Sequence, residues 1–240
     1  MNLTYLILKL KIMPQQTITR SYPFADGDLK QKADGLATTL TRDLTDLAAR
    51  KITDGFIKHL RELTNNFDEH STDAELLGLV QDATLKKNDT RKATETAVRS
   101  IRNMADIVYG GKGKYNSFGF ENLTELTDED FYRLAKRVVR ISTKYLPDLE
   151  PQGLTTDQID ALKTLATNFD NDIDAIEDAV ENRDVETQER INKGNTLWTE
   201  MTKLASVGKS VFEDTNEAKF NDYVLMPSEG SDGGNDKPTV

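Results

Sequence analysis

Residues 155–180 read TTDQIDALKTLATNFDNDIDAIEDAV, and this stretch decides the fold class. Its apolar side chains recur at every third or fourth residue, which is the spacing of one face of an α-helix. The run Thr155-Thr156-Asp157 is suited to cap the helix N-terminus. The pattern predicts an amphipathic helix whose apolar stripe consists of Leu162, Leu165, Phe169, Ile173, Ile176 and Val180.

The same spacing is found upstream of this stretch. From Asp28 to Phe67 it predicts one long helix, or two helices joined near Gly55. A second series starts after Ser71-Thr72-Asp73, which supplies an N-cap and an acidic first turn, and ends at Gly110-Gly111, because glycine commonly stops a helix. Within that series, the polar run Lys86-Lys87-Asn88-Asp89-Thr90 predicts a turn with a new cap.

Between Gly110 and residue 155, Thr127 is expected to cap another helix, with Asp128, Glu129 and Asp130 in its first turn. Pro147 and Pro151 should end that helix. The helix that starts at Thr155 is predicted to turn at Asn182-Arg183-Asp184. A last helix then carries the stripe Ile191, Leu197, Trp198, Met201, Leu204, Val207 and Val211.

An internal repeat indicates that these helices form two copies of one unit. Segments of similar residue types recur in the same order, but the offset between them rises from 84 to 103 residues across one hairpin. The second copy is therefore predicted to have the longer hairpin. The matches are residues 43–50 with 130–137 (offset 87), 72–73 with 156–157 (offset 84), 101–109 with 204–212 (offset 103) and 114–118 with 219–223 (offset 105).

We therefore expect an all-α fold, an up-and-down helical bundle from a degenerate tandem duplication of three-helix units. Residues 28–122 are the first helical repeat, and residues 123–225 are the second, packed with the first as one domain. Residues 1–27 are expected to be an N-terminal extension, partly extended or disordered, and residues 226–240 a disordered tail. For residues 1–12, an over-called start before Met13 or a frayed end is favoured over a packed or exported segment.

The composition argues against several classes of protein. The 41 acidic residues outnumber the 31 Lys and Arg residues, so the net charge is −10 and nucleic-acid binding is not expected. The only dense basic run, Lys112-Gly113-Lys114, is too short to make a groove. The absence of cysteine removes disulfides, thiolate metal sites and cysteine nucleophiles. No stretch approaches the roughly 20 apolar residues of a membrane helix, so we expect a soluble, cytoplasmic protein without membrane insertion.

Motifs that would indicate chemistry are incomplete. Val207-Gly208-Lys209-Ser210 resembles the end of a phosphate-binding loop, but Lys203 stands where a glycine is needed and a helix precedes it instead of a strand. His59 and His70 lie outside the HExxH and ExxH patterns of metal sites. Asp26-Gly27-Asp28 lacks the remaining ligands of a calcium loop. We expect no catalytic residue, no metal and no cofactor.

One segment, Gly110–Phe120, is a candidate binding site. Lys112 and Lys114 would contact an anion, and Tyr115 or Phe118 would stack on a ligand. The favoured alternative is a connector whose aromatic residues cover the end of the bundle. The matching segment of the second copy, residues 219–223, keeps the aromatic residues but lacks the glycines.

Residues 205–225 read ASVGKSVFEDTNEAKFNDYVL. This run resembles the closing segment of a family of bacterial helical-bundle proteins with no known activity, and the similarity covers most of the chain from about Asp28. The resemblance implies an all-α fold and provides no functional residues to carry over. Some relatives continue past such a segment into a small β-domain, where this chain has a polar tail.

The sequence alone does not identify the function. A duplicated bundle with long polar faces and no catalytic constellation favours a non-enzymatic protein-interaction or scaffold protein, with a protein partner or self-association. Two alternatives stay open, namely a small-molecule or anion binder that uses the Gly110–Phe120 loop and a self-assembling structural subunit. An enzyme of unrecognised type is less favoured.

Overall fold

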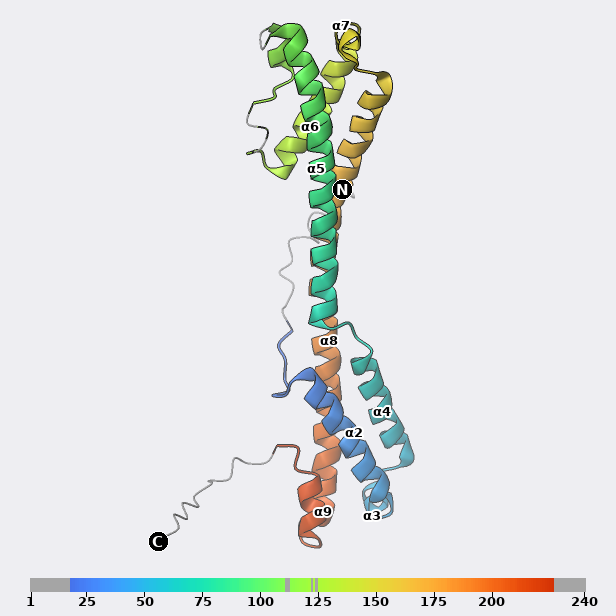
Figure 1. Cartoon of the computed structure of the whole chain (residues 1–240). Helices are drawn as coiled ribbons and strands as arrows, with labels where there is room; N and C mark the ends of the chain where they lie inside the picture. Colours follow the sequence, from blue (N-terminus) through green and yellow to red (C-terminus); the bar gives the residue numbers. More distant parts are fainter. Residues whose placement is uncertain (1–17, 111–112, 122, 124, 227–240) are drawn as a thin grey trace, which may run out of the picture. The chain divides into compact units, whose positions relative to one another are not determined.

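The computed structural model describes residues 18–110, 113–121, 123 and 125–226. In these residues the chain forms α-helices and short 3-10 helices and no strand, which confirms the all-α fold class (Figure 1). The elements are α2 (Asp26–Arg42), α3 (Leu44–Leu47), η1 (Ala48–Arg50), α4 (Asp54–Asp68), α5 (Asp73–Tyr109), η2 (Gly113–Ser117), α6 (Asp128–Lys144), α7 (Leu146–Leu149), η3 (Glu150–Gln152), α8 (Thr156–Phe212) and α9 (Glu217–Asp222).

The chain divides into two compact units, each with its own core. Unit 1 consists of residues 1–71 and 185–240, and unit 2 consists of residues 72–184. The division falls just before α5 and within α8, because the 57-residue helix α8 supplies residues to both units. The sequence predicts a boundary between the two helical repeats at residues 122 and 123, and this position lies inside unit 2.

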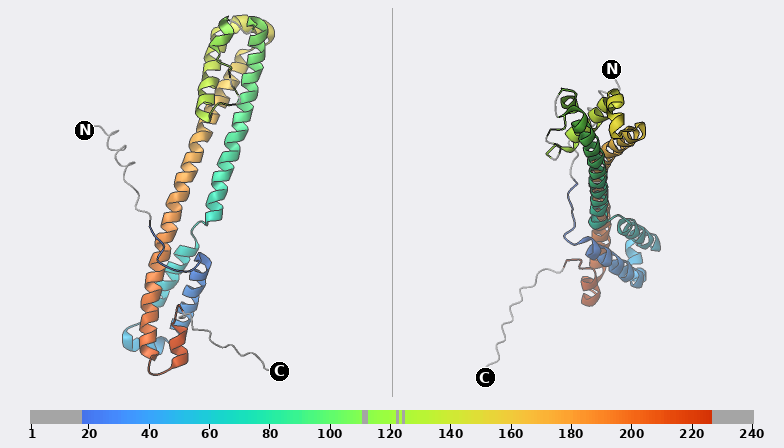
Figure 2. Two further views of the ribbon diagram at one scale, coloured as in Figure 1. Left: turned by 90° about the vertical axis from the view of Figure 1, so that its left-hand side faces the viewer. Right: turned by 45° about the horizontal axis from the view of Figure 1, so that its top comes forward.

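Unit 1 packs α2 and α4 against the C-terminal part of α8 (Figures 1 and 2). Each helix buries one face only, as expected for amphipathic helices. Tyr22, which precedes α2, and Tyr223, which follows α9, complete the core. The buried helical residues include Leu29, Leu36 and Leu40 of α2, Leu60 and Phe67 of α4, and Leu197, Met201 and Leu204 of α8.

Unit 2 packs α6 and the C-terminal part of α5 with the N-terminal part of α8. The rings of Phe131 and Phe169 meet edge to face, with centroids 5.6 Å apart. Phe118 and Phe120 close the core beyond the end of α5. The other buried residues include Val98 and Ile101 of α5, Leu134 and Val138 of α6, and Ile159 and Leu162 of α8.

Local capping signals were predicted correctly. Thr72 and Glu75 form a reciprocal capping box at the start of α5, in which the backbone N–H of Thr72 donates to the Glu75 carboxylate at 2.7 Å. The hydroxyl of Thr127 accepts from the backbone N–H of Asp130 at 3.3 Å. Thr155 accepts in the same way from Gln158 at the start of α8. These contacts satisfy backbone donors that a helix leaves free at its N-terminus.

Two predicted turns are wrong. Residues 86–90 and 182–184 lie inside the continuous helices α5 and α8. The ammonium of Lys86 and the hydroxyl of Thr90 contact the carboxylate of Asp172 at 2.9 and 2.7 Å, respectively. The polar run is therefore a helical face that faces α8, and neither run contains a glycine or proline to break the helix.

The order of elements gives a different register for the internal repeat. The succession α2, α3 and η1 has the same lengths, 17, 4 and 3 residues, as the succession α6, α7 and η3, at a constant offset of 102 residues. Buried residues follow the same offset, with Ile57, Leu60 and Phe67 matching Ile159, Leu162 and Phe169.

The pairing of residues 43–50 with 130–137 is therefore wrong, because the first segment contains α3 and η1 whereas the second lies within α6. The longer second hairpin is also wrong, since α8 contains no turn. The offset is 102 residues as far as Phe67 and 103 to 105 residues from Ile101 onward, so the match of residues 72–73 with 156–157 does not fit this register. The duplication stays a prediction, now with a nearly constant offset.

Gly208 and Gly35 provide a matched test of the packing in unit 1. A Cβ added at Gly208 would lie 2.3 Å from the buried ring of Tyr223, whereas a Cβ at Gly35 in α2 meets no atom within 4 Å. We expect Gly208→Ala to lower the free energy of unfolding by about 1–3 kcal/mol through overpacking. Gly35→Ala should raise it by about 0.5–1 kcal/mol, because alanine favours the helix. Urea unfolding monitored by circular dichroism measures both, and equal effects would contradict the packing at Gly208.

Candidate functional site

The described residues of the Gly110–Phe120 segment contribute to packing in unit 2. Phe118 is fully buried and stacks on Phe120, with ring centroids 5.0 Å apart. Tyr115 is half-buried, and its ring lies 5.5 Å from that of Phe120. Lys112 lies outside the described residues. The structure thus brings Tyr115 and Phe118 together against the core, which leaves no open face of Phe118 for a ligand.

Lys114 of the same segment already has an anionic partner. Its ammonium forms an ion pair with Asp148 and lies 4.8 Å from the ring centroid of Tyr145. The Tyr109 hydroxyl donates to the same carboxylate at 3.0 Å. The ion pair lowers the pKa of Asp148, and burial together with this hydrogen bond raises the pKa of Tyr109 to about 12. Lys114 therefore neutralises a carboxylate of its own unit.

Unit 1 contains a corresponding arrangement around Lys219. Its ammonium contacts the carboxylates of Asp43 and Asp46 at 2.9 and 2.7 Å and lies 4.8 Å from the ring centroid of Phe212. Relative to the cluster in unit 2, Lys219 takes the place of Lys114 and Asp46 that of Asp148. The two lysine-aromatic segments have the same structural role, as the packing alternative predicts.

The carboxylate of Asp43 is the most completely enclosed charge in this arrangement, since its side chain has no exposed surface. It accepts from the Arg42 guanidinium at 2.6 Å and from the Tyr223 hydroxyl at 3.1 Å. These bonds, the one from Arg42 above all, hold the pKa of Asp43 at about 2 despite its burial. Burial and the Asp43 charge raise the pKa of Tyr223.

The incomplete phosphate-binding motif also serves packing. Residues 207–210 lie within α8, and the ring of Tyr223 lies against Gly208. Among the described residues, no group of three or more His, Asp or Glu side chains could hold a metal ion.

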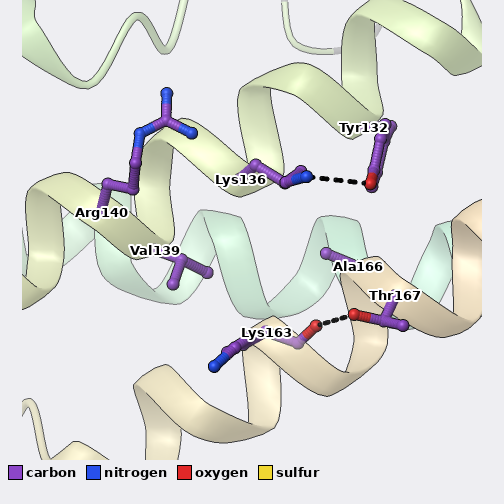
Figure 3. Close-up of a pocket in the computed structure, with 7 residues that line it drawn as sticks. All are labelled: Tyr132, Lys136, Val139, Arg140, Lys163, Ala166 and Thr167. Atoms are coloured by element: carbon purple, nitrogen blue, oxygen red, sulfur yellow. Dashed lines mark hydrogen bonds between the residues drawn. The ribbon is translucent and has the colours of Figure 1, made fainter.

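A groove of about 290 Å³ lies between α6 and α8 of unit 2 (Figure 3). Val139 and the buried Ala166 contribute its apolar surface. Figure 3 shows Lys136 extending along α6, where its ammonium donates to the hydroxyl of Tyr132 at 3.1 Å. The remaining lining residues are Arg140 of α6 and Lys163 and Thr167 of α8.

The helix α6 carries a dense positive charge beside this groove. After Asp130 it contains five cationic residues and no carboxylate, and all five cations are exposed. None of them forms an ion pair within the described part of the chain, whereas Asp128 in the first turn is paired with Lys87 and Arg91. We call these residues the basic face: Arg133, Lys136, Arg137, Arg140 and Lys144.

The sequence interpretation missed the basic face because it searched for consecutive basic residues. The signal was present at helical spacing, with cations at positions 133, 137, 140 and 144 between the residues of the apolar stripe. Chemically, unpaired cations beside an apolar groove suit the recognition of carboxylates or other anions.

Removal of the Asp43 charge tests the cluster in unit 1. We expect Asp43→Asn to lower the free energy of unfolding by about 1–3 kcal/mol at pH 7, because Arg42 and Lys219 lose their enclosed partner. The folded pKa of about 2 lies below the ordinary value of 3.8, so this stabilisation is present above about pH 4 and is lost as the pH falls towards 2.

Urea unfolding of both proteins at pH 7 and between pH 4 and 2 measures this difference. Asp46→Asn is the matched control, because Asp46 shares Lys219 but is half exposed, and its effect should stay under about 1 kcal/mol. If the difference in the free energy of unfolding between wild type and Asp43→Asn does not shrink on acidification, the stabilising role of the Asp43 charge is contradicted.

Comparisons of the chain with protein-family models, with curated proteins and with solved structures found no match. The resemblance of residues 205–225 to a family of bacterial helical-bundle proteins therefore stays a prediction. None of the described helices is long and apolar enough to cross a membrane.

Proposed function

We propose that this chain is a non-enzymatic interaction protein that binds an acidic partner on the basic face and the adjoining groove of unit 2. The single observation that carries the proposal is the set of five cations on α6 that form no ion pair with any residue that the structure describes, in a chain whose net charge is −10. An acidic chain that concentrates unneutralised positive charge on one helix creates a local field that attracts acidic surfaces.

The groove adds specificity to this charge. Val139 and Ala166 offer apolar contact, and Tyr132, Arg140 and Lys163 surround it. Tyrosine and arginine are enriched among the residues that dominate binding energy at protein interfaces. Charged groups around an apolar contact also increase the rate of encounter and exclude partners of like charge.

The nature of the partner follows from the size and charge of the surface. The phosphate backbone of a long nucleic acid would be repelled by the rest of the acidic chain, so nucleic acid is disfavoured as the partner. A short acidic segment of a protein can bind on a surface no longer than α6, so it would avoid this repulsion. Cysteine-free composition suits a cytoplasmic location, which remains part of the proposal.

The anion-binding alternative at the Gly110–Phe120 loop receives less support. Lys114 is neutralised by Asp148, and Phe118 is enclosed by the core. A ligand there would have to compete with an ion pair of the unit itself. The basic face offers cations without such competition.

A photo-crosslinking residue at Thr167, an exposed position in the groove wall, tests the proposal in cells of the native host. We expect one discrete protein adduct. Lys136→Glu/Arg140→Glu in the same chain should reduce its yield at least about five-fold, because two attractions become repulsions. The adduct is identified by mass spectrometry.

The same crosslinker at Thr38, an exposed position of α2 in unit 1, is the control and should not give this adduct. The proposal fails if the Thr167 adduct also forms at Thr38, or if charge reversal leaves its yield unchanged.

A further inference from the structure

Unit 2 contains a second surface whose charge is opposite to that of the basic face. Residues 170–181 of α8 include six carboxylates and no cation. Asp172 is used within the unit, where it contacts Lys86 and Thr90. The other carboxylates have no cationic partner within the described part of the chain. Four of them lie along one side of the helix and form what we call the acidic stripe: Asp170, Asp174, Glu177 and Glu181.

The acidic stripe and the basic face have matching spacing. Successive residues of the acidic stripe are separated by 4, 3 and 4 positions. Along α6, Arg133, Arg137, Arg140 and Lys144 are also separated by 4, 3 and 4 positions. Each row therefore spans about 16 Å of helix. Because the order 4, 3, 4 reads the same in both directions, the rows match whether the two helices run parallel or antiparallel.

The two rows do not neutralise each other within one molecule. None of the five cations of the basic face pairs with a carboxylate of the acidic stripe, although both surfaces belong to unit 2. Asp174, Glu177 and Glu181 are exposed, as is every cation of the basic face. The complementary rows are therefore both accessible to another molecule.

Asp172 shows which side of α8 faces α5. Its carboxylate contacts Lys86 and Thr90 of α5 at 2.9 and 2.7 Å. Successive residues of an α-helix are rotated by about 100°, so the acidic stripe lies on the side of α8 roughly opposite to Asp172. The acidic stripe therefore faces away from α5 and towards solvent.

We infer that the acidic partner is a second copy of this chain, whose acidic stripe on α8 docks on the basic face of α6. This inference rests on the proposed function, because it identifies the partner of the same surface. The contact joins two different surfaces, so two copies can exchange two such contacts, or further copies can add in sequence. Surface ion pairs are individually weak and are screened by salt, so the association should be concentration-dependent and salt-sensitive.

The mass of this 240-residue chain in solution tests the inference. Sedimentation equilibrium at about 0.5 mM protein and about 20 mM NaCl should give an average mass above the 27.0 kDa of one chain. About 0.5 M NaCl should return the mass to that of one chain.

Charge-swap variants identify the surfaces. The middle residues of each row face each other in either direction of docking, so Arg137→Glu/Arg140→Glu and Asp174→Lys/Glu177→Lys are the variants to compare. Each variant alone should weaken self-association at least about ten-fold, because two attractions become repulsions. An equimolar mixture should restore association, since each variant keeps one native surface and the reversed surfaces also match.

Arg50→Glu/Arg61→Glu provides the matched control, because both arginines of unit 1 are exposed and form no ion pair with the residues described by the structure. It should associate like wild type. Circular dichroism checks that all variants keep their helical content, as expected for substitutions at exposed positions.

The outcomes separate this inference from the proposed function. A wild-type chain that stays at 27.0 kDa in low salt overturns self-association. A mixture of the two charge-swap variants that fails to associate overturns the pairing of these surfaces. If the Thr167 crosslinker instead captures a different protein in a charge-dependent manner, the proposed function holds and only the inference of a second copy fails.

Discussion

A helix that runs unbroken for 57 residues can shield its apolar stripe only where other helices lie along it. This constraint on α8 organises the chain. In unit 2 the stripe is covered by α5 and α6, and in unit 1 by α2 and α4. Each covering helix is amphipathic as well and buries one face, so most of the remaining helical surface stays in water. On that surface, charges of one sign gather on two segments, with cations on α6 after Asp130 and carboxylates on residues 170–181 of α8.

The features that sequence reasoning predicts correctly are local ones. Apolar periodicity identifies the helical stripes, and Thr72, Thr127 and Thr155 cap their helices because capping needs only residues three positions apart. The polar run at Lys86–Thr90 was misassigned because a polar run suits a turn equally well until its partner is known. The partner, Asp172, is distant in sequence. The register of the repeat was misassigned for a related reason, since similar residue types recur within any amphipathic helix.

The candidate sites show the same division. Sequence reasoning identified the lysine and the aromatic residues of the Gly110–Phe120 segment, and it named packing as the alternative to ligand binding. Only the fold shows that Asp148 neutralises Lys114 and that Phe118 is enclosed. The basic face was overlooked for the opposite reason. Its positions can be found from the sequence at helical spacing, but whether its cations have partners depends on neighbours that the sequence does not reveal.

The discontinuity of unit 1 has a consequence for the nascent chain. Helices α2 and α4 leave the ribosome before unit 2, and the part of α8 that completes their core follows only after residues 72–184. At about 5–20 residues per second, that delay lasts about 6 to 23 seconds. During this time Leu29, Leu60 and Phe67 lack the covering side chains of Leu197 and Met201. Helices α2 and α4 are thus synthesised before all of unit 2 but are shielded from water only after it, which leaves their apolar faces open to chaperones in the meantime.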